Sequence, residues 1–377
     1  MPSEKIKSVI KDYHVLIVRS ETQVTSELIS GMDKMIVIGR AGTGVDNIDV
    51  GSATRKGIVV MNTPGGNTIS TAEHTIALML GMCRNIAQSN QSLRSGKWER
   101  KKFQGSEIEG KTLGIIGLGK VGMEVAKRAK AFGMTVISYD PVLSAESAGK
   151  QGISLVELDK IYADSDIISV HVPLNGETEN LISETTLRKC RDGVNIINCA
   201  RGGFVNESAL LEALKAGKVS AAALDVFTAE PPDTAGELIQ HPKVLTTPHL
   251  GASTGEAQEK VAIQIAEQIS GLLQNISVKG SVNAASIEAL QNEDIKPFIK
   301  LSENLGIMIT QMNKGPLKNL VINLCGSFLQ SYSEILSRSF LKGFLSGKID
   351  EPVNLINSAM LAGERGIILN EIKSNEN

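Results

Sequence analysis

A glycine-rich string is the clearest pattern of chemical significance in this sequence. Gly117, Gly119 and Gly122 form a GxGxxG string that follows a β-branched run and opens a helical segment, and Asp140 ends the next such run. In dinucleotide-binding folds the first glycine makes the turn, the second lets the backbone approach the pyrophosphate, and the third lets helix and strand pack closely. Asp140 would bond the ribose hydroxyls and repel a 2′-phosphate, which favours NAD over NADP. The alternative interpretation is a glycine-rich turn without a ligand.

Three further strings, residues 198–203, 225–232 and 247–254, follow predicted strands and supply one arginine, one glutamate and one histidine. Ligands of open α/β sheets bind beyond this end of the strands. Arg201 can hold a carboxylate through two parallel hydrogen bonds. His249 can take up a hydroxyl proton while a hydride leaves, and Glu230 can orient the imidazole and favour its protonated form. Together they suit the oxidation of a secondary alcohol.

Each of these three side chains also has a simpler explanation when taken singly. Arg201 could be a solvated turn residue, Glu230 could merely precede a rigid Pro-Pro pair, and His249 could only cap a loop. The sequence favours chemistry because all three occur in the same structural context.

The elements that must position these residues are short β-branched runs that alternate with amphipathic helical segments. This alternation, with 36 glycines and only 3% aromatic residues, is typical of an α/β fold with a parallel sheet. The predicted helices include residues 70–95, 121–132, 207–216 and 254–273. The predicted strands are residues 15–18, 35–38, 58–61, 112–116, 135–138, 167–170, 194–198, 221–224 and 244–246.

The order of these elements predicts three domains. A Rossmann-type, doubly wound NAD-binding domain over residues 65–253 is inserted into a smaller, split, flavodoxin-like substrate domain over residues 1–64 and 254–285. A partial α+β domain over residues 286–377 follows, with a helix near 297–311, an extended run at 320–325 and a helix at 333–345.

Composition excludes several classes of function. The 39 basic and 41 acidic side chains give a formal net charge of −2, which argues against nucleic acid as a partner. No apolar stretch approaches the roughly 20 residues that cross a bilayer, and residues 1–11 do not resemble a secretory leader. The four cysteines are far apart and no His, Cys and carboxylate cluster has metal-ligand spacing. We therefore expect a cytoplasmic protein with no metal site and no membrane segment.

The glycine string and the three strings around Arg201, Glu230 and His249 resemble the D-isomer-specific 2-hydroxyacid dehydrogenases over residues 15–285. The resemblance implies that Arg201 binds the substrate carboxylate, that Glu230 orients the histidine, and that His249 is the catalytic acid/base. It also implies cofactor contacts, with Cys199 as a packing residue rather than a nucleophile. Beside the three glycines and Asp140, these contacts are Thr43, Lys120, Val121, Val172, Cys199, Ala200, Asp225, Gly251 and Ala252.

Within that family, the strings at residues 39–49, 60–64 and 97–103 are similar to those of animal-type enzymes that oxidise 3-phospho-D-glycerate to 3-phosphohydroxypyruvate with NAD, the first step of L-serine biosynthesis. This substrate carries a carboxylate and a phosphate, so it needs cations at both ends. The resemblance places Arg19 and Arg40, each after a predicted strand, in the substrate cleft. The N–H groups of Gly65, Gly66 and Asn67 could also cradle substrate oxygens, and residues 100–102 either reach a second subunit's site or form a solvated face.

The resemblance also implies two departures from the family. By comparison with the family pattern, we expect one βα unit before residue 15 and the serine-binding regulatory domain to lack a counterpart in this sequence. Two other functions stay open: a glyoxylate or hydroxypyruvate reductase of the same family, and a non-catalytic NAD-sensing protein. For the 3-phosphoglycerate-oxidising enzyme we expect a homodimer or homotetramer, with the dimer formed through the 70–95 helix and the segment after it.

Overall fold

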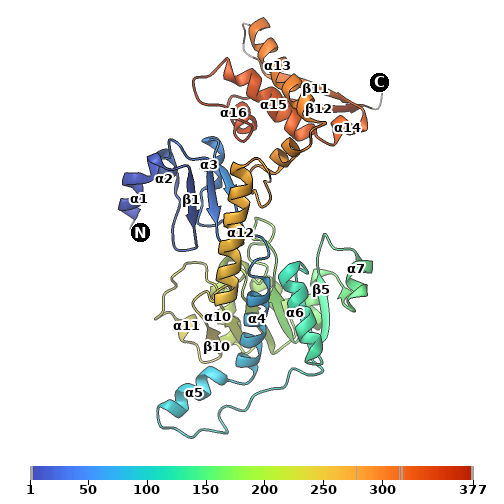
Figure 1. Ribbon diagram of the computed structural model, residues 1–377. Coiled ribbons are helices and arrows are strands. Elements are labelled where there is room, and N and C mark those ends of the chain that lie inside the picture. Colours follow the sequence, from blue (N-terminus) through green and yellow to red (C-terminus); the bar gives the residue numbers. More distant parts are fainter. Residues whose placement is uncertain (1–2, 277, 314, 316, 375–377) are drawn as a thin grey trace. The chain divides into compact units, whose positions relative to one another are not determined.

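The computed structural model describes residues 3–276, 278–313, 315 and 317–374, and the chain divides into two compact units (Figure 1). The first unit comprises residues 1–66 and 259–377, and the second comprises residues 67–258. The predicted α/β fold with parallel sheets is confirmed, because every strand pairing within the sheets is parallel.

The second unit contains a seven-stranded sheet in the order β10-β9-β8-β7-β4-β5-β6. Strand order reverses between β4 and β7, which is the switch point where doubly wound sheets bind nucleotides. The strands are β4 (Thr112–Ile116), β5 (Thr135–Tyr139), β6 (Ser154–Leu155), β7 (Ile167–Val170), β8 (Val194–Asn198), β9 (Val219–Leu224) and β10 (Val244–Thr246).

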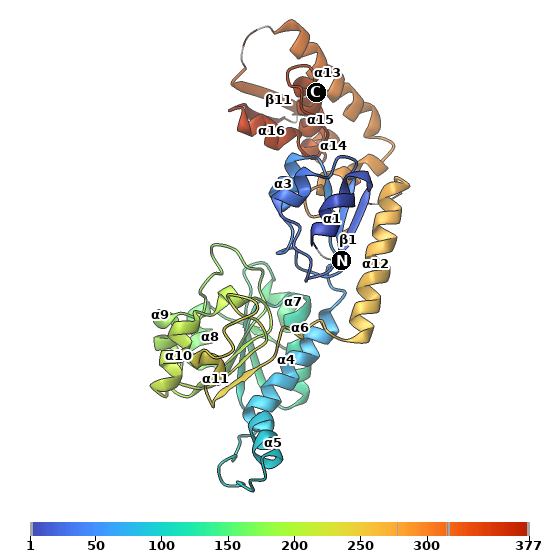
Figure 2. The ribbon, with the colours of Figure 1, turned by 90° about the vertical axis from the view of Figure 1, so that its left-hand side faces the viewer.

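Helices cover both faces of this sheet, so that its central strands are buried on both sides, as parallel sheets require. Figure 2 shows α8, α9 and α10 on one side of the sheet and α4 and α6 on the other. The helices of this unit are α4 (Thr68–Cys83), α5 (Ile86–Arg94), α6 (Lys120–Ala131), α7 (Ala145–Lys150), α8 (Leu158–Asp164), α9 (Glu184–Lys189), α10 (Glu207–Lys215) and α11 (Glu237–Gln240).

The single helix predicted over residues 70–95 is wrong. The structure divides it into α4 and α5 at Asn85, whose φ of 52° lies in the left-handed region. Asparagine tolerates that conformation better than most residues, so the chain can turn there while apolar residues continue at helical spacing. α4 buries nine residues against the sheet, whereas α5 buries none.

The first unit begins with a three-stranded parallel sheet in the order β1-β2-β3. Ile265 and Ile269 of α12 pack on one face of it, and a Cβ at Gly39 would lie only 2.6 Å from the Ile269 side chain. α12 (Gly255–Leu273) belongs to the first unit from Glu259 onwards. The other elements are α1 (Ser3–Val9), β1 (Val15–Val18), α2 (Ser26–Ser30), β2 (Val37–Arg40), α3 (Val50–Arg55) and β3 (Val59–Met61).

The three strands lie in chain order, because each crossover adds the next strand to the same side, so that β1 forms one edge of the sheet and β3 the other. The strands of a flavodoxin-like sheet that follow its single reversal of strand order also run in chain order. The segment after α12 covers the other edge at β3, where Asn283 accepts a hydrogen bond from the Val60 N–H (2.8 Å) and donates to the Ile58 carbonyl (2.9 Å).

The C-terminal part of the first unit is built on two helices that pack closely. A Cβ at Gly306 would lie 2.1 Å from the Phe340 carbonyl oxygen, and one at Gly343 would lie 2.0 Å from the Glu303 carbonyl oxygen, so only glycine allows this approach. The elements are α13 (Lys296–Met312), β11 (Asn319–Cys325), α14 (Ser327–Gln330), α15 (Ser333–Ser346), α16 (Ser358–Glu364) and β12 (Ile368–Ser374). β11 and β12 pair in parallel.

Candidate active site

The glycine string forms the turn between β4 and α6 in the second unit. Gly117 has a φ of 96°, and a Cβ there would lie 2.5 Å from the His171 carbonyl oxygen. A Cβ at Gly122 would lie 2.1 Å from the Gly117 carbonyl oxygen, so strand and helix pack backbone to backbone. Around Gly119, by contrast, no atom lies within 4 Å of such a Cβ. The space at the start of α6 is therefore open to a phosphate group, and these glycines fit a bound dinucleotide.

Asp140 follows β5 beside this turn. Its Oδ2 accepts a hydrogen bond from the Leu118 N–H (2.8 Å), and its Oδ1 accepts from the Val142 and Leu143 N–H groups (2.9 and 3.0 Å). Burial alone would raise the pKa of Asp140, but these three donors hold it below its ordinary value. An ionised carboxylate has four acceptor positions, so Asp140 can still accept from the hydroxyls of a ribose.

Glu230 and His249 form a hydrogen-bonded pair. His249 Nδ1 lies 2.7 Å from Glu230 Oε2, and Glu230 Oε1 accepts a hydrogen bond from the Phe227 N–H (3.2 Å). The two side chains are 42% and 38% exposed, which leaves the other ring nitrogen of His249 available to a substrate. This is the geometry of a general acid/base that a carboxylate orients.

His249 lies in an unusual backbone conformation. Its φ is 54°, in the left-handed region that few residues other than glycine adopt. Its N–H donates to the carbonyl oxygens of Asp225 (2.9 Å) and Thr247 (3.0 Å), and these bonds fix the turn. Such strained residues occur mainly where surrounding contacts hold a functional side chain in place.

Asp225 is a fully buried carboxylate next to this turn. Its Oδ1 accepts hydrogen bonds from Thr247 Oγ1 (2.6 Å) and the Leu250 N–H (2.7 Å), and its Oδ2 accepts one from the Gly251 N–H (2.8 Å). His74 Nε2 lies 3.1 Å from Oδ1. Burial would raise the pKa of Asp225, but these hydrogen bonds keep it below its ordinary value, so the carboxylate is ionised. Both carboxylate oxygens of Asp225 thus accept hydrogen bonds from groups of the protein.

Arg201 follows β8 in the same unit. The turn is shaped by Asn198, whose buried amide accepts from the Ala200 N–H (3.1 Å) and donates to the Arg201 carbonyl (2.6 Å). The guanidinium Nη1 donates to the Ala200 carbonyl (2.6 Å). The neighbouring Cys199 is buried, and burial raises the pKa of its thiol to about 12, which supports a packing role.

The other expected cofactor contacts are distributed over both units. Lys120 and Val121 begin α6, Val172 lies against the Gly117 turn, and Gly251 and Ala252 follow His249. Thr43 belongs to the first unit, where its hydroxyl donates to the Thr63 carbonyl (3.5 Å).

The two expected phosphate-binding arginines lie in the first unit and share a buried partner. Arg40 ends β2, and its Nε donates to the Asn47 amide oxygen (2.8 Å). Asn47 is only 7% exposed, and its amide nitrogen donates to the carbonyl oxygens of Arg19 (2.8 Å) and Thr22 (2.6 Å). Asn47 thereby connects the Arg40 side chain to the loop that carries Arg19.

The expected substrate loop crosses the boundary of the two units. Gly65 has a φ of 91°, and a Cβ at Gly66 would lie 2.4 Å from a Val261 methyl group, so both positions require glycine. Asn67 starts the second unit and caps α4.

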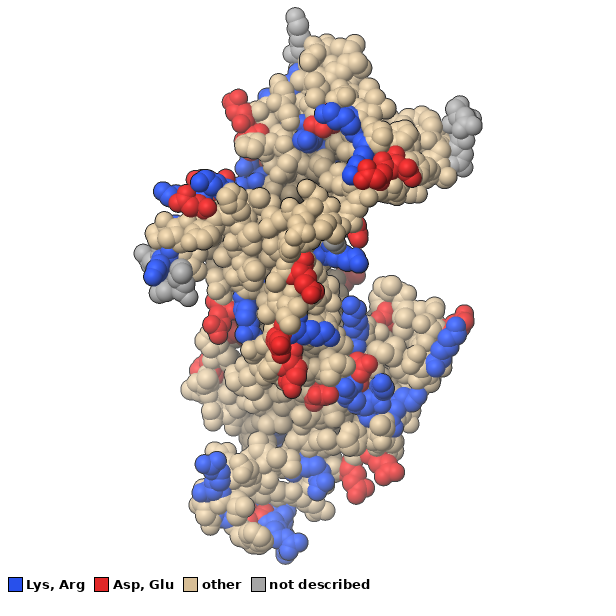
Figure 3. Space-filling view, viewed as in Figure 1, with Lys and Arg blue, Asp and Glu red and all other residues tan. Residues whose placement is uncertain are grey.

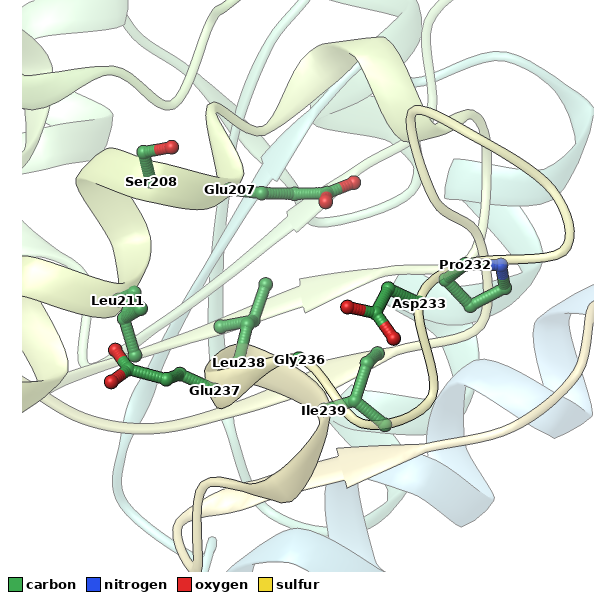
Figure 4. Close-up of a pocket in the computed structure, with 9 residues that line it drawn as sticks. All are labelled: Glu207, Ser208, Leu211, Pro232, Asp233, Gly236, Glu237, Leu238 and Ile239. Atoms are coloured by element: carbon green, nitrogen blue, oxygen red, sulfur yellow. The ribbon is translucent and has the colours of Figure 1, made fainter.

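A pocket of about 200 Å³ lies next to the segment that carries Glu230, between the start of α10 and α11 (Figure 4). Glu207, Asp233 and Glu237 line it together with Leu211 and apolar residues of α11. Glu207 accepts a hydrogen bond from the Thr228 N–H (2.6 Å), and Glu237 is paired with Lys215 (2.7 Å). Three carboxylates would repel an anionic substrate, so this pocket does not fit the expected substrate.

Within the described part of the chain, no group of three or more His, Cys, Asp and Glu side chains is arranged to hold a metal ion.

The sequence analysis assigned no role to Asn47, Asn198 or His74. Asn198 opens the string 198–203 that contains Arg201, and Asn47 lies within the string 39–49, but neither string shows which groups these asparagines bind. The partners of Asn47 and His74 are up to 28 and 173 residues away in sequence, so no local pattern reveals them.

Comparison with known proteins identifies the family. Residues 76–251 match the model of the D-isomer specific 2-hydroxyacid dehydrogenase NAD-binding domain, and residues 294–377 match that of the D-3-phosphoglycerate dehydrogenase intervening domain. The chain is 46% identical to D-3-phosphoglycerate dehydrogenase from Archaeoglobus fulgidus, over 99% of this chain and 71% of the relative. The identity to the Bacillus subtilis enzyme of that name is 44%, over 97% and 69%. The chain belongs to the D-3-phosphoglycerate dehydrogenase family.

The solved structures agree with this membership. A glyoxylate reductase from Paecilomyes thermophila is 34% identical and superposes with a TM-score of 0.68, over 74% of this chain and 87% of that chain. The predicted Rossmann-type fold, the predicted cofactor NAD and the predicted class of NAD-dependent D-2-hydroxyacid dehydrogenases are thus confirmed. None of the helices in the described ranges is long and apolar enough to span a membrane.

Proposed function

We propose that this chain oxidises 3-phospho-D-glycerate to 3-phosphohydroxypyruvate with NAD, the first step of L-serine biosynthesis. The observation that carries the proposal is the 2.7 Å pair of His249, which follows β10, and Glu230, which follows β9, in the unit whose β4 turn fits a dinucleotide. The near-complete alignment of this chain with relatives named for that activity supports the same substrate.

The proposed reaction uses this chain's own residues in three roles. His249 accepts the hydroxyl proton of the substrate as the C–O bond becomes a carbonyl, and Glu230 stabilises the imidazolium that forms. Arg201 holds the carboxylate next to the reacting carbon. The glycines of the β4 turn and Asp140 would hold the pyrophosphate and the adenosine ribose of NAD, which would supply the acceptor for the hydride from that carbon.

The phosphate end of the substrate needs a second cationic group. Arg19 and Arg40 of the first unit supply it in this proposal, and Asn47 orders the Arg40 guanidinium and the backbone at Arg19. The Gly66 N–H donates to the Thr63 carbonyl oxygen (3.2 Å), so in this proposal the loop contributes the N–H groups at Gly65 and Asn67 to substrate oxygens. A hydroxypyruvate reductase would not need these two arginines, and an NAD sensor would not need the Glu230–His249 pair.

His249→Ala tests the proposal. We expect kcat to fall by about 100-fold to 10,000-fold while the Kd for NADH, measured by fluorescence, stays unchanged, because the substitution removes only the proton-transfer group. A variant that keeps most of the wild-type rate would refute the role of His249.

We further propose a cytoplasmic homodimer, or a tetramer built from such dimers, that forms through α5 and the segment after it. Ile86, Leu93 and Trp98 are 57%, 56% and 77% exposed, which leaves an apolar surface uncovered in the single chain. Exposed Lys and Arg also gather on this segment (Figure 3). Sedimentation of wild type and Leu93→Asp tests the interface, and the variant should sediment as a monomer.

The cytoplasm is favoured because all four cysteines of the chain are free, which suits a reducing compartment. Cell fractionation with detection of the native chain tests this location. Recovery from a membrane or secreted fraction would contradict it.

A further inference from the structure

The loop that carries His249 is held by side chains of a helix that precedes it by more than 150 residues. We define the histidine loop as residues 247–251. α4 contributes Ser70, whose hydroxyl donates to the Gly251 carbonyl (2.8 Å), and Thr71, whose hydroxyl donates to the same oxygen (3.2 Å). One helical turn further along, His74 reaches the other end of the loop. All these residues belong to the second unit.

His74 acts on the loop at two points. Its Nε2 lies 3.1 Å from Asp225 Oδ1 and 3.1 Å from Thr247 Oγ1. Because the Thr247 hydroxyl donates to Asp225 and that carboxylate is ionised, Nε2 is the protonated nitrogen and donates to Asp225. The His74 side chain is 18% exposed and that of Asp225 is fully buried, so water does not readily replace this donor.

Asp225 in turn fixes the histidine loop. Its carboxylate accepts from Thr247, Leu250 and Gly251, and its carbonyl accepts the His249 N–H. These bonds support His249 at a φ of 54°, a conformation that residues other than glycine adopt in only a few per cent of cases. In the described structure, the Asp225 carboxylate accepts hydrogen bonds from groups of the histidine loop and from one other element, α4, through His74.

We propose that His74 is a positioning residue that, through Asp225 and Thr247, keeps the histidine loop in the conformation that presents His249 to the substrate. His74 does not touch the reacting atoms in this arrangement. The inference rests on the proposed function only for its kinetic consequence, because the order of the loop can be measured without turnover.

The test compares His74→Leu with His74→Gln in the full-length chain. Leucine removes the donor and keeps much of the volume, whereas the glutamine amide nitrogen can replace Nε2. Ser138→Ala is the matched control, since it removes a buried hydrogen bond to the Ile115 carbonyl (2.8 Å) in the same unit but away from the loop. Thermal unfolding of all variants monitors the cost to stability.

Two readouts are expected to separate His74→Leu from the control. Amide hydrogen exchange in the peptide that contains residues 247–251 should accelerate, with the other peptides of the unit unchanged. In NADH-dependent reduction of 3-phosphohydroxypyruvate, kcat should fall by about 10-fold to 100-fold with an unchanged Kd for NADH, because a small displacement of a catalytic group costs that much. His74→Gln should restore both readouts, and Ser138→Ala should change neither.

The proposal is overturned if exchange of the loop is the same in His74→Leu and in the control, or if His74→Gln is as impaired as His74→Leu. If His74→Leu does not fold, Thr247→Val removes the hydroxyl donor with little change of shape and carries the same expectations. If the wild-type chain does not reduce 3-phosphohydroxypyruvate but loop exchange is still faster in His74→Leu, the proposed function is contradicted and the positioning role of His74 is supported.

Discussion

At the scale of single residues, the site depends on side chains that fix other side chains. Glu230 holds His249, Asn198 shapes the Arg201 turn, and Asn47 connects Arg40 to the Arg19 loop. Each of these partners is buried or bonded to backbone groups, which preorganises the charged atoms that would meet the substrate.

Asp140→Ala is predicted to weaken NAD binding and relax the preference over NADP. The substitution removes an ionised acceptor for the ribose hydroxyls. Loss of hydrogen bonds to a charged group of this kind should raise the KM for NAD about 10-fold to 100-fold. Steady-state kinetics with both cofactors measures the change. Asp166→Asn is the control, since Asp166 accepts the Thr112 N–H (2.8 Å) at the opposite end of β4. An unchanged ratio of NAD to NADP would refute the role of Asp140.

Asn47→Ala is predicted to act on the phosphate end of the substrate. Arg40 loses the acceptor that orients its guanidinium, so the KM for 3-phosphohydroxypyruvate should rise about 10-fold, while kcat/KM for hydroxypyruvate stays within a factor of about two. Asn283→Ala removes a comparable set of hydrogen bonds in the same unit, away from either arginine. Equal losses with both substrates would show that Asn47 only stabilises the unit.

The residues to which the proposed function gives chemical roles stand in recognisable strings after strands, so the sequence alone was enough to propose them. It was not enough to propose the residues that hold them. Asn47 is a single asparagine in a loop, and His74 lies among the apolar residues of α4, so only the folded chain shows that each faces a distant partner.

At the scale of elements, the strands were predicted best. Buried parallel strands are nearly continuous β-branched runs, and the predicted ranges 15–18, 112–116, 167–170, 194–198 and 244–246 coincide with β1, β4, β7, β8 and β10. β2 begins two residues later than predicted. β6 has only two residues, and β12 is mostly exposed and polar, so neither gave a pattern to recognise.

The contact of α13 with α15 gives a prediction about stability. Gly306→Ala should destabilise this pair by about 1–3 kcal/mol. The new methyl group would clash with the Phe340 carbonyl oxygen and the Phe344 backbone nitrogen, so the backbone of α15 would have to move. Gly363→Ala in α16 is the control, because no atom lies within 4 Å of its Cβ and alanine favours a helix. Amide hydrogen exchange of α13 at increasing urea concentrations measures the free energy of unfolding of this pair in both variants. Equal stability would contradict the close packing.

At the scale of the whole molecule, the expected site residues are divided between the two units. The second unit carries the dinucleotide turn, Arg201 and the Glu230–His249 pair, whereas the first carries Arg19 and Arg40. Turnover of a substrate with two anionic ends therefore requires both units in the proposed function. The sequence analysis expected the site residues to be shared between two domains because a long helix follows β3 and a second one, α12, follows β10, and it assigned residues 286–377 to a third domain.

The most direct test of the proposed function is the oxidation of NADH by the purified chain with 3-phosphohydroxypyruvate, measured beside hydroxypyruvate without the phosphate. The proposed function predicts a preference for the phosphorylated compound of at least about 100-fold in kcat/KM, since a site built for a charged group rejects the analogue that lacks it. Equal rates with both compounds, or no turnover by a folded chain that binds NADH, would contradict it.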